Sequence, residues 1–176
     1  MPTTPEIIDT AVKIGLGALI SASGAYWVAH HNHDRDAEKE RLRRRRELLE
    51  EVAEQVEHFT HAALRCWSVA SEVAGFRDRN QAPPAKRVEV LFARRADLYE
   101  AFQQISSAEA KLLLLGEIDA QKLLRDYGEY VGEVRSNTHP DHLASVTEFT
   151  AHRAGILKRR MQFFARLSAD YAKPKR

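Results

Sequence analysis

The 176-residue chain has little cysteine, glycine and proline, and each shortage narrows the architectures open to it. Its single cysteine, Cys66, can form no disulfide within the chain and cannot supply a zinc site built from cysteines. Only 8 glycines and 6 prolines are present, and Ala, Leu, Glu and Arg are abundant, which favours helices over strands. The composition therefore predicts an all-α fold.

The chain also lacks a large excess of one charge. Lys and Arg total 27 and Asp and Glu total 25, so the formal net charge is +2. This balance disfavours a protein that binds nucleic acid over its whole surface. The charge is uneven, however, because residues 34–47 hold seven basic side chains against five acidic ones.

Motifs that carry catalysis are missing as well. There is no G-x-S-x-G nucleophile turn and no glycine loop that could cradle a phosphate. Neighbouring residues of a helix point about 100° apart, so the adjacent His30, His31 and His33 cannot converge on one metal ion without an irregular backbone. His58 and His61 lie one turn apart, but no Glu has a His three residues later, as a di-iron bundle requires. We predict no catalytic residue, no metal site, no cofactor and no small-molecule substrate.

A segment near the N-terminus is nearly free of charge. Residues 14–29 are 16 uncharged residues, about 24 Å of helix, which is shorter than the roughly 30 Å hydrocarbon core of a bilayer. Extension back to Ile7 gives about 34 Å but includes Asp9 and Lys13, which can pair at i,i+4 near one end. We predict a single transmembrane helix within residues 1–29. A buried or interfacial helix and a cleaved signal peptide are the alternatives.

The same segment carries features typical of membrane helices. Tyr26 and Trp27 stand at its end, where an aromatic belt is expected. Gly17, Ser21 and Gly24 share one face, and small residues at such spacing let two helices approach closely in lipid. We predict that this face packs against another anchor helix.

Residues 30–46 form a predicted juxtamembrane segment rich in histidine and arginine. Basic residues crowd this flank of the anchor, so the positive-inside rule places the N-terminus outside and the bulk of the chain in the cytoplasm, as in a bacterial-type inner membrane protein. Arginines beside an anionic lipid surface contribute about 1 kcal/mol each. A solvated helix face is the alternative. The predicted lipid or phosphate contacts are Arg41, Arg43, Arg44, Arg45 and Arg46.

Residues 47–172 are predicted to form a cytoplasmic helical bundle, followed by a basic tail at 173–176. A long helix runs from about residue 34 to a predicted cap at Gly75, and further helices cover about 84–115, 119–135 and 140–172, giving an antiparallel four-helix arrangement. Apolar residues at alternating spacings of three and four predict a seam for a coiled coil or for packing inside the bundle. The seam residues are Leu49, Val52, Val56, Phe59, Ala63, Cys66, Ala70 and Val73.

Two further patterns lie on the later helices. The run Leu112, Leu113, Leu114 and Leu115 is too short to span a membrane and predicts a buried end of the bundle. A GxxxG pattern at Gly128 and Gly132 predicts close helix packing or local weakness.

These features together predict a non-enzymatic, single-pass membrane protein whose bundle acts as a scaffold or sensor. We expect it to self-associate or to dock another helical protein. One alternative is a membrane-active effector whose clustered anchors permeabilise the bilayer. A second is a soluble helical protein that binds nucleic acid or an acidic partner through the arginine run, although the interspersed acids disfavour nucleic acid.

Overall fold

Helices and their connecting turns make up the computed structural model, which describes the backbone of residues 4–172 and the side chains of residues 37–140 and 142–172. This confirms the predicted all-α fold. The elements are α1 (Thr4–Asp78), α2 (Ala85–Leu114), α3 (Ile118–Ser136), the 3₁₀ turn η1 (Pro140–His142) and α4 (Val146–Ala172).

The chain divides into two compact units, Met1–Arg44 and Arg45–Arg176. The first unit contains only the N-terminal part of α1, and the second contains the remainder of α1 with α2, α3 and α4. The three segments predicted from sequence, 1–29, 30–46 and 47–172, stay a prediction.

The predicted anchor falls on residues whose side chains lie outside the described part of the chain, and so does its packing face of Gly17, Ser21 and Gly24. Among the residues that were described, no helix is long and apolar enough to cross a membrane. The structure therefore gives no support to the transmembrane part of the predicted fold.

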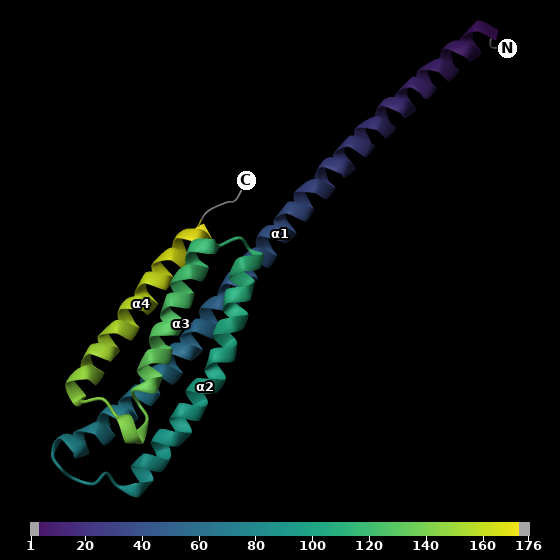
Figure 1. Cartoon of the computed structure of the whole chain (residues 1–176). Coiled ribbons are helices and arrows are strands. Elements are labelled where there is room, and N and C mark those ends of the chain that lie inside the picture. Colours follow the sequence, from purple (N-terminus) through teal and green to yellow (C-terminus); the bar gives the residue numbers. More distant parts are fainter. Residues whose placement is uncertain (1–3, 173–176) are drawn as a thin grey trace. The chain divides into compact units, whose positions relative to one another are not determined.

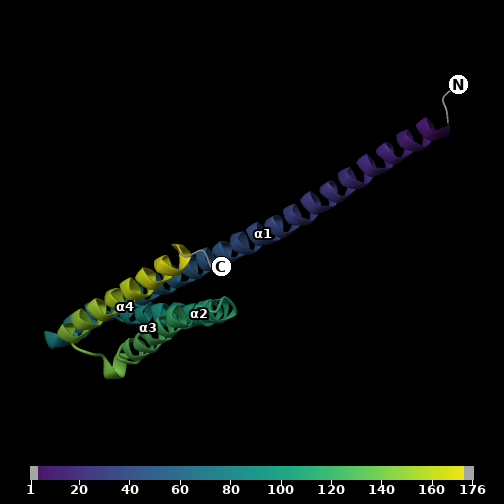
Figure 2. The same ribbon diagram turned by 90° about the horizontal axis from the view of Figure 1, so that it is seen from above.

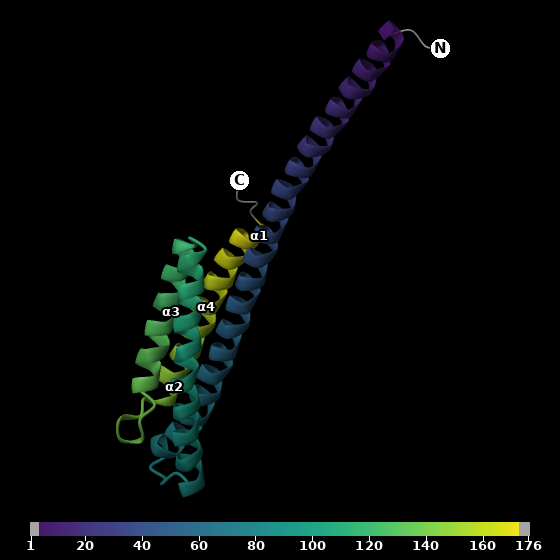
Figure 3. The same cartoon turned by 90° about the vertical axis from the view of Figure 1, so that its right-hand side faces the viewer.

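The second unit is an antiparallel bundle formed by the C-terminal part of α1 and by α2, α3 and α4 (Figure 1, Figure 2, Figure 3). Short connections between successive helices force neighbours to run in opposite directions. Helix α3 packs on both α2 and α4. Helix α1 reaches α2 through the Phe59 and Phe102 rings, and it reaches α4 through the Trp67 indole, which donates a hydrogen bond to the Phe149 carbonyl.

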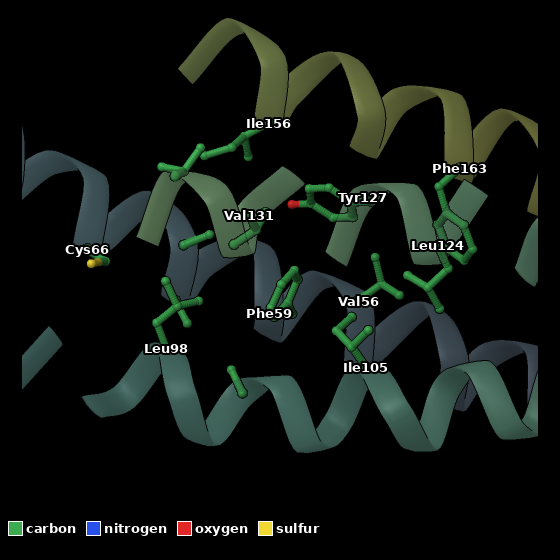
Figure 4. Packing of buried hydrophobic residues seen from close by; sticks show 14 of the residues in the cluster. Val56, Phe59, Cys66, Leu98, Ile105, Leu124, Tyr127, Val131, Ile156 and Phe163 are labelled. Carbon is green, nitrogen blue, oxygen red and sulfur yellow. The ribbon is translucent and has the colours of Figure 1, made fainter. Parts of the chain in front are cut away.

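The bundle core is formed by apolar side chains from all four segments (Figure 4). Phe59 lies at its centre, with its ring edge-to-face against Phe102 at 5.0 Å and against Tyr127 at 5.5 Å. This geometry is the one that aromatic quadrupoles favour. The Tyr127 hydroxyl is paired with the Thr60 hydroxyl at 2.9 Å, which satisfies the one polar group of this large side chain.

The seam predicted on α1 is buried within the chain. Its eight residues are each at most 2 % exposed. They belong to the same core cluster as side chains of α2, α3 and α4. A coiled coil between chains through these residues would require the bundle to open.

Helix α1 ends later than the sequence predicts. Gly75 lies inside the helix, which continues to Asp78. The left-handed residue after the end is Asn80, with φ of 54°, and Gln81 donates its N–H to the Phe76 carbonyl at 2.8 Å. Asn tolerates this conformation because its short polar side chain can bond locally, so the predicted glycine cap at Gly75 is wrong.

The start of the last helix also differs from the prediction. Pro140 begins only the single turn of η1, and α4 begins at Val146. The Glu148 carboxylate accepts hydrogen bonds at 2.8 Å from the Ser145 N–H and hydroxyl, while the Ser145 Oγ accepts the Glu148 N–H at 3.3 Å. This reciprocal capping box, S-x-x-E in the sequence, satisfies otherwise unpaired N–H groups and fixes where α4 begins.

Two glycines mark where α3 approaches its neighbours. A Cβ at Gly128 would stand 3.5 Å from Ile105 of α2, an ordinary contact, whereas a Cβ at Gly155 of α4 would overlap the Tyr130 ring of α3. A side chain would therefore fit at Gly128, and the position that requires glycine for close helix packing is Gly155, outside the GxxxG pattern.

Candidate functional site

One end of the bundle brings together three parts of the chain, and we name it the basal end. It comprises residues 45–49 of α1, residues 113–118 at the α2–α3 turn and residues 167–172 of α4. Arg45 joins them, because its Nη2 atom lies 2.7 Å from the Glu117 carboxylate and 2.9 Å from the Asp170 carbonyl oxygen. The two side chains of the ion pair are 12 % and 5 % exposed. Charges so far from water are tolerated only when paired and hydrogen-bonded.

Arg45 was predicted to contact lipid or phosphate together with its neighbours, but the structure directs it into the bundle. The physical reason is register: Arg45 precedes Leu49 by four residues, so it continues the seam spacing toward the N-terminus. A charge at this position reaches a carboxylate because Glu117 lies at the start of α3. The sequence contained this signal in the seam spacing, although the arginine run obscures it.

The α2–α3 turn that carries Glu117 is tightly defined. Gly116 has φ of 70°, and Glu117 donates its N–H to the Leu112 carbonyl at 2.8 Å while Gly116 donates to Leu113 at 3.0 Å. This pair of bonds is a Schellman motif, in which a left-handed residue ends a helix and satisfies its last carbonyls. Glycine suits the position because it carries no Cβ.

Three large apolar side chains are exposed on this turn, and we name them the apolar tip. Leu113 is 48 % exposed, Leu114 is 85 % exposed and Ile118 is 46 % exposed. Leu112 is fully buried and Leu115 packs against the core. The prediction of a buried end therefore holds for these two leucines and is wrong for Leu113 and Leu114. The helix turns by about 100° per residue, so four consecutive leucines cannot all face one core.

Both acidic residues beside the apolar tip are engaged by arginines. Glu117 pairs with Arg45, and the Asp119 carboxylate lies 3.1 Å from an Arg166 guanidinium nitrogen. Arg166 also contacts Asp170, which is 2 % exposed, at 3.0 Å. The turn thus presents apolar surface beside carboxylates that each contact an arginine.

The other four predicted contact residues, Arg41, Arg43, Arg44 and Arg46, have exposed side chains. Of these, Arg46 belongs to the bundle unit and the other three belong to the first unit. No ligand contact tests their predicted role, which stays a prediction.

Among the hollows on the bundle surface, two lie between α1 and a neighbouring helix. An apolar one of about 290 Å³ lies between α1 and α4 near the basal end, and Tyr171 at its rim donates its hydroxyl to Glu50 at 2.9 Å. That bond to a carboxylate raises the pKa of Tyr171. A polar hollow of about 390 Å³ lies between α1 and α2, and its lining includes His58, Arg65, Asp97 and Glu100.

The opposite end of the bundle, which we name the distal end, contains the single cysteine. Cys66 is buried, with its sulfur 3.9 Å from the Thr138 hydroxyl, and burial raises the pKa of its thiol. A thiol kept protonated is a poor nucleophile. Thr138 also accepts a hydrogen bond at 2.7 Å from Arg95, which donates a second bond at 2.8 Å to the Arg135 carbonyl at the end of α3.

The histidines give no metal centre in the described side chains, where no group of three or more metal-binding residues lies together. His58 and His61 are exposed on α1. The cluster of His30, His31 and His33 lies outside the side chains that the structure describes.

Comparison with known proteins identifies no relative: no protein-family model, no curated protein and no solved structure matches the chain. The candidate site therefore rests on the residues of this chain alone.

Proposed function

We propose that this protein is a non-enzymatic membrane tether. A helix within residues 7–29 crosses a bacterial-type inner membrane with the N-terminus outside. It holds the helical bundle at the cytoplasmic surface as a scaffold or sensor. The observation that carries the proposal is the order of segments: an uncharged stretch at 14–29, an arginine-rich run at 41–46, and then the basal end of the bundle.

The described chemistry is consistent with a scaffold. Cys66 is buried and its pKa is raised, and Arg45 and Glu117 are consumed in an ion pair that joins helices. A thiol and a carboxyl group are common nucleophiles and acids of enzymes, and here their contacts hold the bundle together.

The partner in this proposal is a helical protein or a second copy of the chain. The α1 seam is occupied by the chain's own helices, so docking would use the exposed faces of the bundle. Self-association would use the anchor face of Gly17, Ser21 and Gly24, where small residues allow close contact in lipid.

The test is membrane fractionation of the full chain with carbonate extraction. Leu19→Asp with Ile20→Asp places two carboxylates in the uncharged stretch, each unfavourable by about 2.5–3.5 kcal/mol at the centre of a spanning helix. The matched control, Met161→Asp with Gln162→Asp, adds the same charge at exposed positions of α4. We expect the wild type and the control to stay in the carbonate-resistant pellet and the first variant to leave it.

A soluble wild-type chain would overturn the proposal. Salt-sensitive nucleic-acid binding that depends on the arginine run would then favour the soluble alternative. Dye leakage from vesicles holding the chain, abolished by Gly17→Leu with Gly24→Leu, would favour the permeabilising alternative over a passive tether.

A further inference from the structure

We infer that the apolar tip at the α2–α3 turn is a lipid-contacting surface that seats the basal end of the bundle on an anionic bilayer. This inference rests on the proposed membrane tether and adds a second point of membrane contact, contributed by the folded bundle.

Three exposed apolar side chains are clustered at the tip, whereas the other exposed apolar residues of the bundle are dispersed. Leu113, Leu114 and Ile118 stand within six residues of one another, and all three are at least 46 % exposed. Phe92 and Tyr99 of α2 and Met161 of α4, also half-exposed or more, lie singly along their helices and away from the tip in sequence. Single exposed apolar residues are ordinary, but a cluster at one tip marks a surface that is covered by something.

The charge around the tip matches an anionic surface. Glu117 and Asp119, the acids at the turn, are paired with Arg45 and Arg166. Lys122, one turn further along α3, is exposed. Arg46 at the start of the bundle unit is exposed as well. Exposed cations beside an apolar group suit the interface of an anionic membrane, where apolar side chains enter the acyl boundary and cations meet headgroups.

The fold also fixes where the tip lies. The 2.7 Å bond from Arg45 to Glu117 holds the turn beside the first residue of the bundle unit, which is itself part of the arginine run. The Schellman bonds of Gly116 and Glu117 keep the turn from fraying. The tip is therefore held beside the point at which the chain enters the bundle.

A lipid surface suits the tip better than a second copy of the chain does. The tip is a protruding turn with three apolar side chains, and a stable protein interface buries roughly 800 Å² on each partner. A bilayer interface accepts a small protruding group without requiring a complementary pocket.

The test places an environment-sensitive fluorophore on the tip of the full chain. Leu114→Cys is labelled with a nitrobenzoxadiazole maleimide, and Phe92→Cys, 50 % exposed on the same helix, is the matched control. The two positions are about 33 Å apart along α2. The native Cys66 is 1 % exposed, so the introduced thiol is the one that reacts, and the unlabelled background is checked on the wild type.

Each labelled chain is reconstituted in vesicles of phosphatidylglycerol and phosphatidylcholine, and quenching by aqueous iodide is compared with quenching by a nitroxide-labelled lipid. We expect the label at position 114 to be several-fold less accessible to iodide than the label at position 92, and to be quenched by the lipid. Leu113→Ser with Ile118→Ser should remove most of that protection. Met161→Ser should not.

The outcomes separate the two proposals. If the chain floats with the vesicles but both labels are equally open to iodide, the tip does not contact lipid while the tether proposal stands. If the chain does not float with the vesicles, both proposals fail. If the label at position 114 is protected without vesicles and in proportion to protein concentration, a second copy covers the tip and the lipid assignment is overturned.

Discussion

The two ends of the bundle each use a buried or half-buried arginine, but the arginines have different partners. At the basal end Arg45 pairs with the carboxylate of Glu117, whereas at the distal end Arg95 donates to a carbonyl oxygen and to the hydroxyl of Thr138. A carboxylate keeps its charge when its partner is removed, while a carbonyl and a hydroxyl are only left without a donor. Substitution of the arginine should therefore lower the free energy of unfolding more at the basal end than at the distal end.

The largest expected effect follows from breaking the basal ion pair. Arg45→Met removes the guanidinium that faces the buried Glu117 carboxylate, and we expect the free energy of unfolding to fall by about 3–5 kcal/mol. Chemical denaturation of the full chain measures this. The double variant Arg45→Met with Glu117→Met should recover a large part of the loss, because it removes both charges. A loss below about 1 kcal/mol in the single variant would mean that solvent screens the pair.

The centre of the bundle should respond to alkaline pH. Burial raises the pKa of Tyr127 to about 12. An unfolded tyrosine ionises near pH 10, so between about pH 10 and pH 12 the unfolded state loses a proton that the folded state keeps, and stability falls by roughly 3 kcal/mol. Tyr127→Phe should flatten that decline, with Tyr99→Phe, an exposed tyrosine, as control. An unchanged slope would contradict the burial of this hydroxyl.

The distal arginine should matter less than the basal one. Arg95→Met leaves the Arg135 carbonyl and the Thr138 hydroxyl without this donor, and we expect a loss of about 1–3 kcal/mol in the same denaturation experiment. A loss equal to that of Arg45→Met would break the comparison between the two ends, since the difference in partner charge would then have no measurable consequence.

A smaller effect is expected at the cap of α4. Ser145→Ala removes the side-chain bond at the start of the helix and should reduce stability by about 1 kcal/mol near neutral pH. Hydrogen bonds from the Ser145 backbone and side chain lower the pKa of Glu148, so this contribution is present above its ordinary value of 4.5 and is lost as pH falls below it. The gap between variant and wild type should narrow in acid, whereas Thr147→Ala should show no such narrowing.

The smallest effects should distinguish two glycines. Gly128→Ala gains helix propensity and meets Ile105 only at ordinary contact distance, so we expect it to be stabilising by up to about 1 kcal/mol. Gly155→Ala must displace the Tyr130 ring, over which the Arg159 guanidinium lies 3.9 Å from the centroid, and should be destabilising. Thermal unfolding measures both. In a Tyr130→Ala background Gly155→Ala should become favourable.

Periodic features of the bundle could be predicted from the sequence, and features that depend on distant partners could not. The seam spacing on α1 is a local repeat, so the side of the helix that includes Val56 and Phe59 could be predicted as apolar packing surface. The ion pair of Arg45 with Glu117 joins residues far apart in the chain, and the sequence around either residue does not indicate its partner. The apolar tip was missed for a related reason, since four leucines in a row have no period that says which of them faces inward.

The ends of the helices also include features that the sequence contains and features that only the structure shows. The S-x-x-E pattern at Ser145 was available in the sequence, but Pro140 competed with it as a helix start and was chosen. At the end of α1, Gly75 looked like a cap because the core residues of the helix end at Ala74, but the helix continues to Asp78 and the left-handed position is Asn80. The start of α4 thus follows a local signal, the capping box, that the sequence contains, and the end of α1 lies beyond the glycine that looked like its cap.

By itself the sequence determined that this chain is helical, that one side of its long helix is apolar, and that an uncharged stretch precedes an arginine run, because composition and spacing along one chain are enough for each. The tertiary structure decided that the seam is filled by the chain's own helices, that one arginine of the run turns inward to a buried carboxylate, and that two leucines and an isoleucine are left exposed beside it. The physical reason is that burial and ion pairing depend on which helix surfaces are in contact across the bundle, and these contacts are between residues far apart in the sequence.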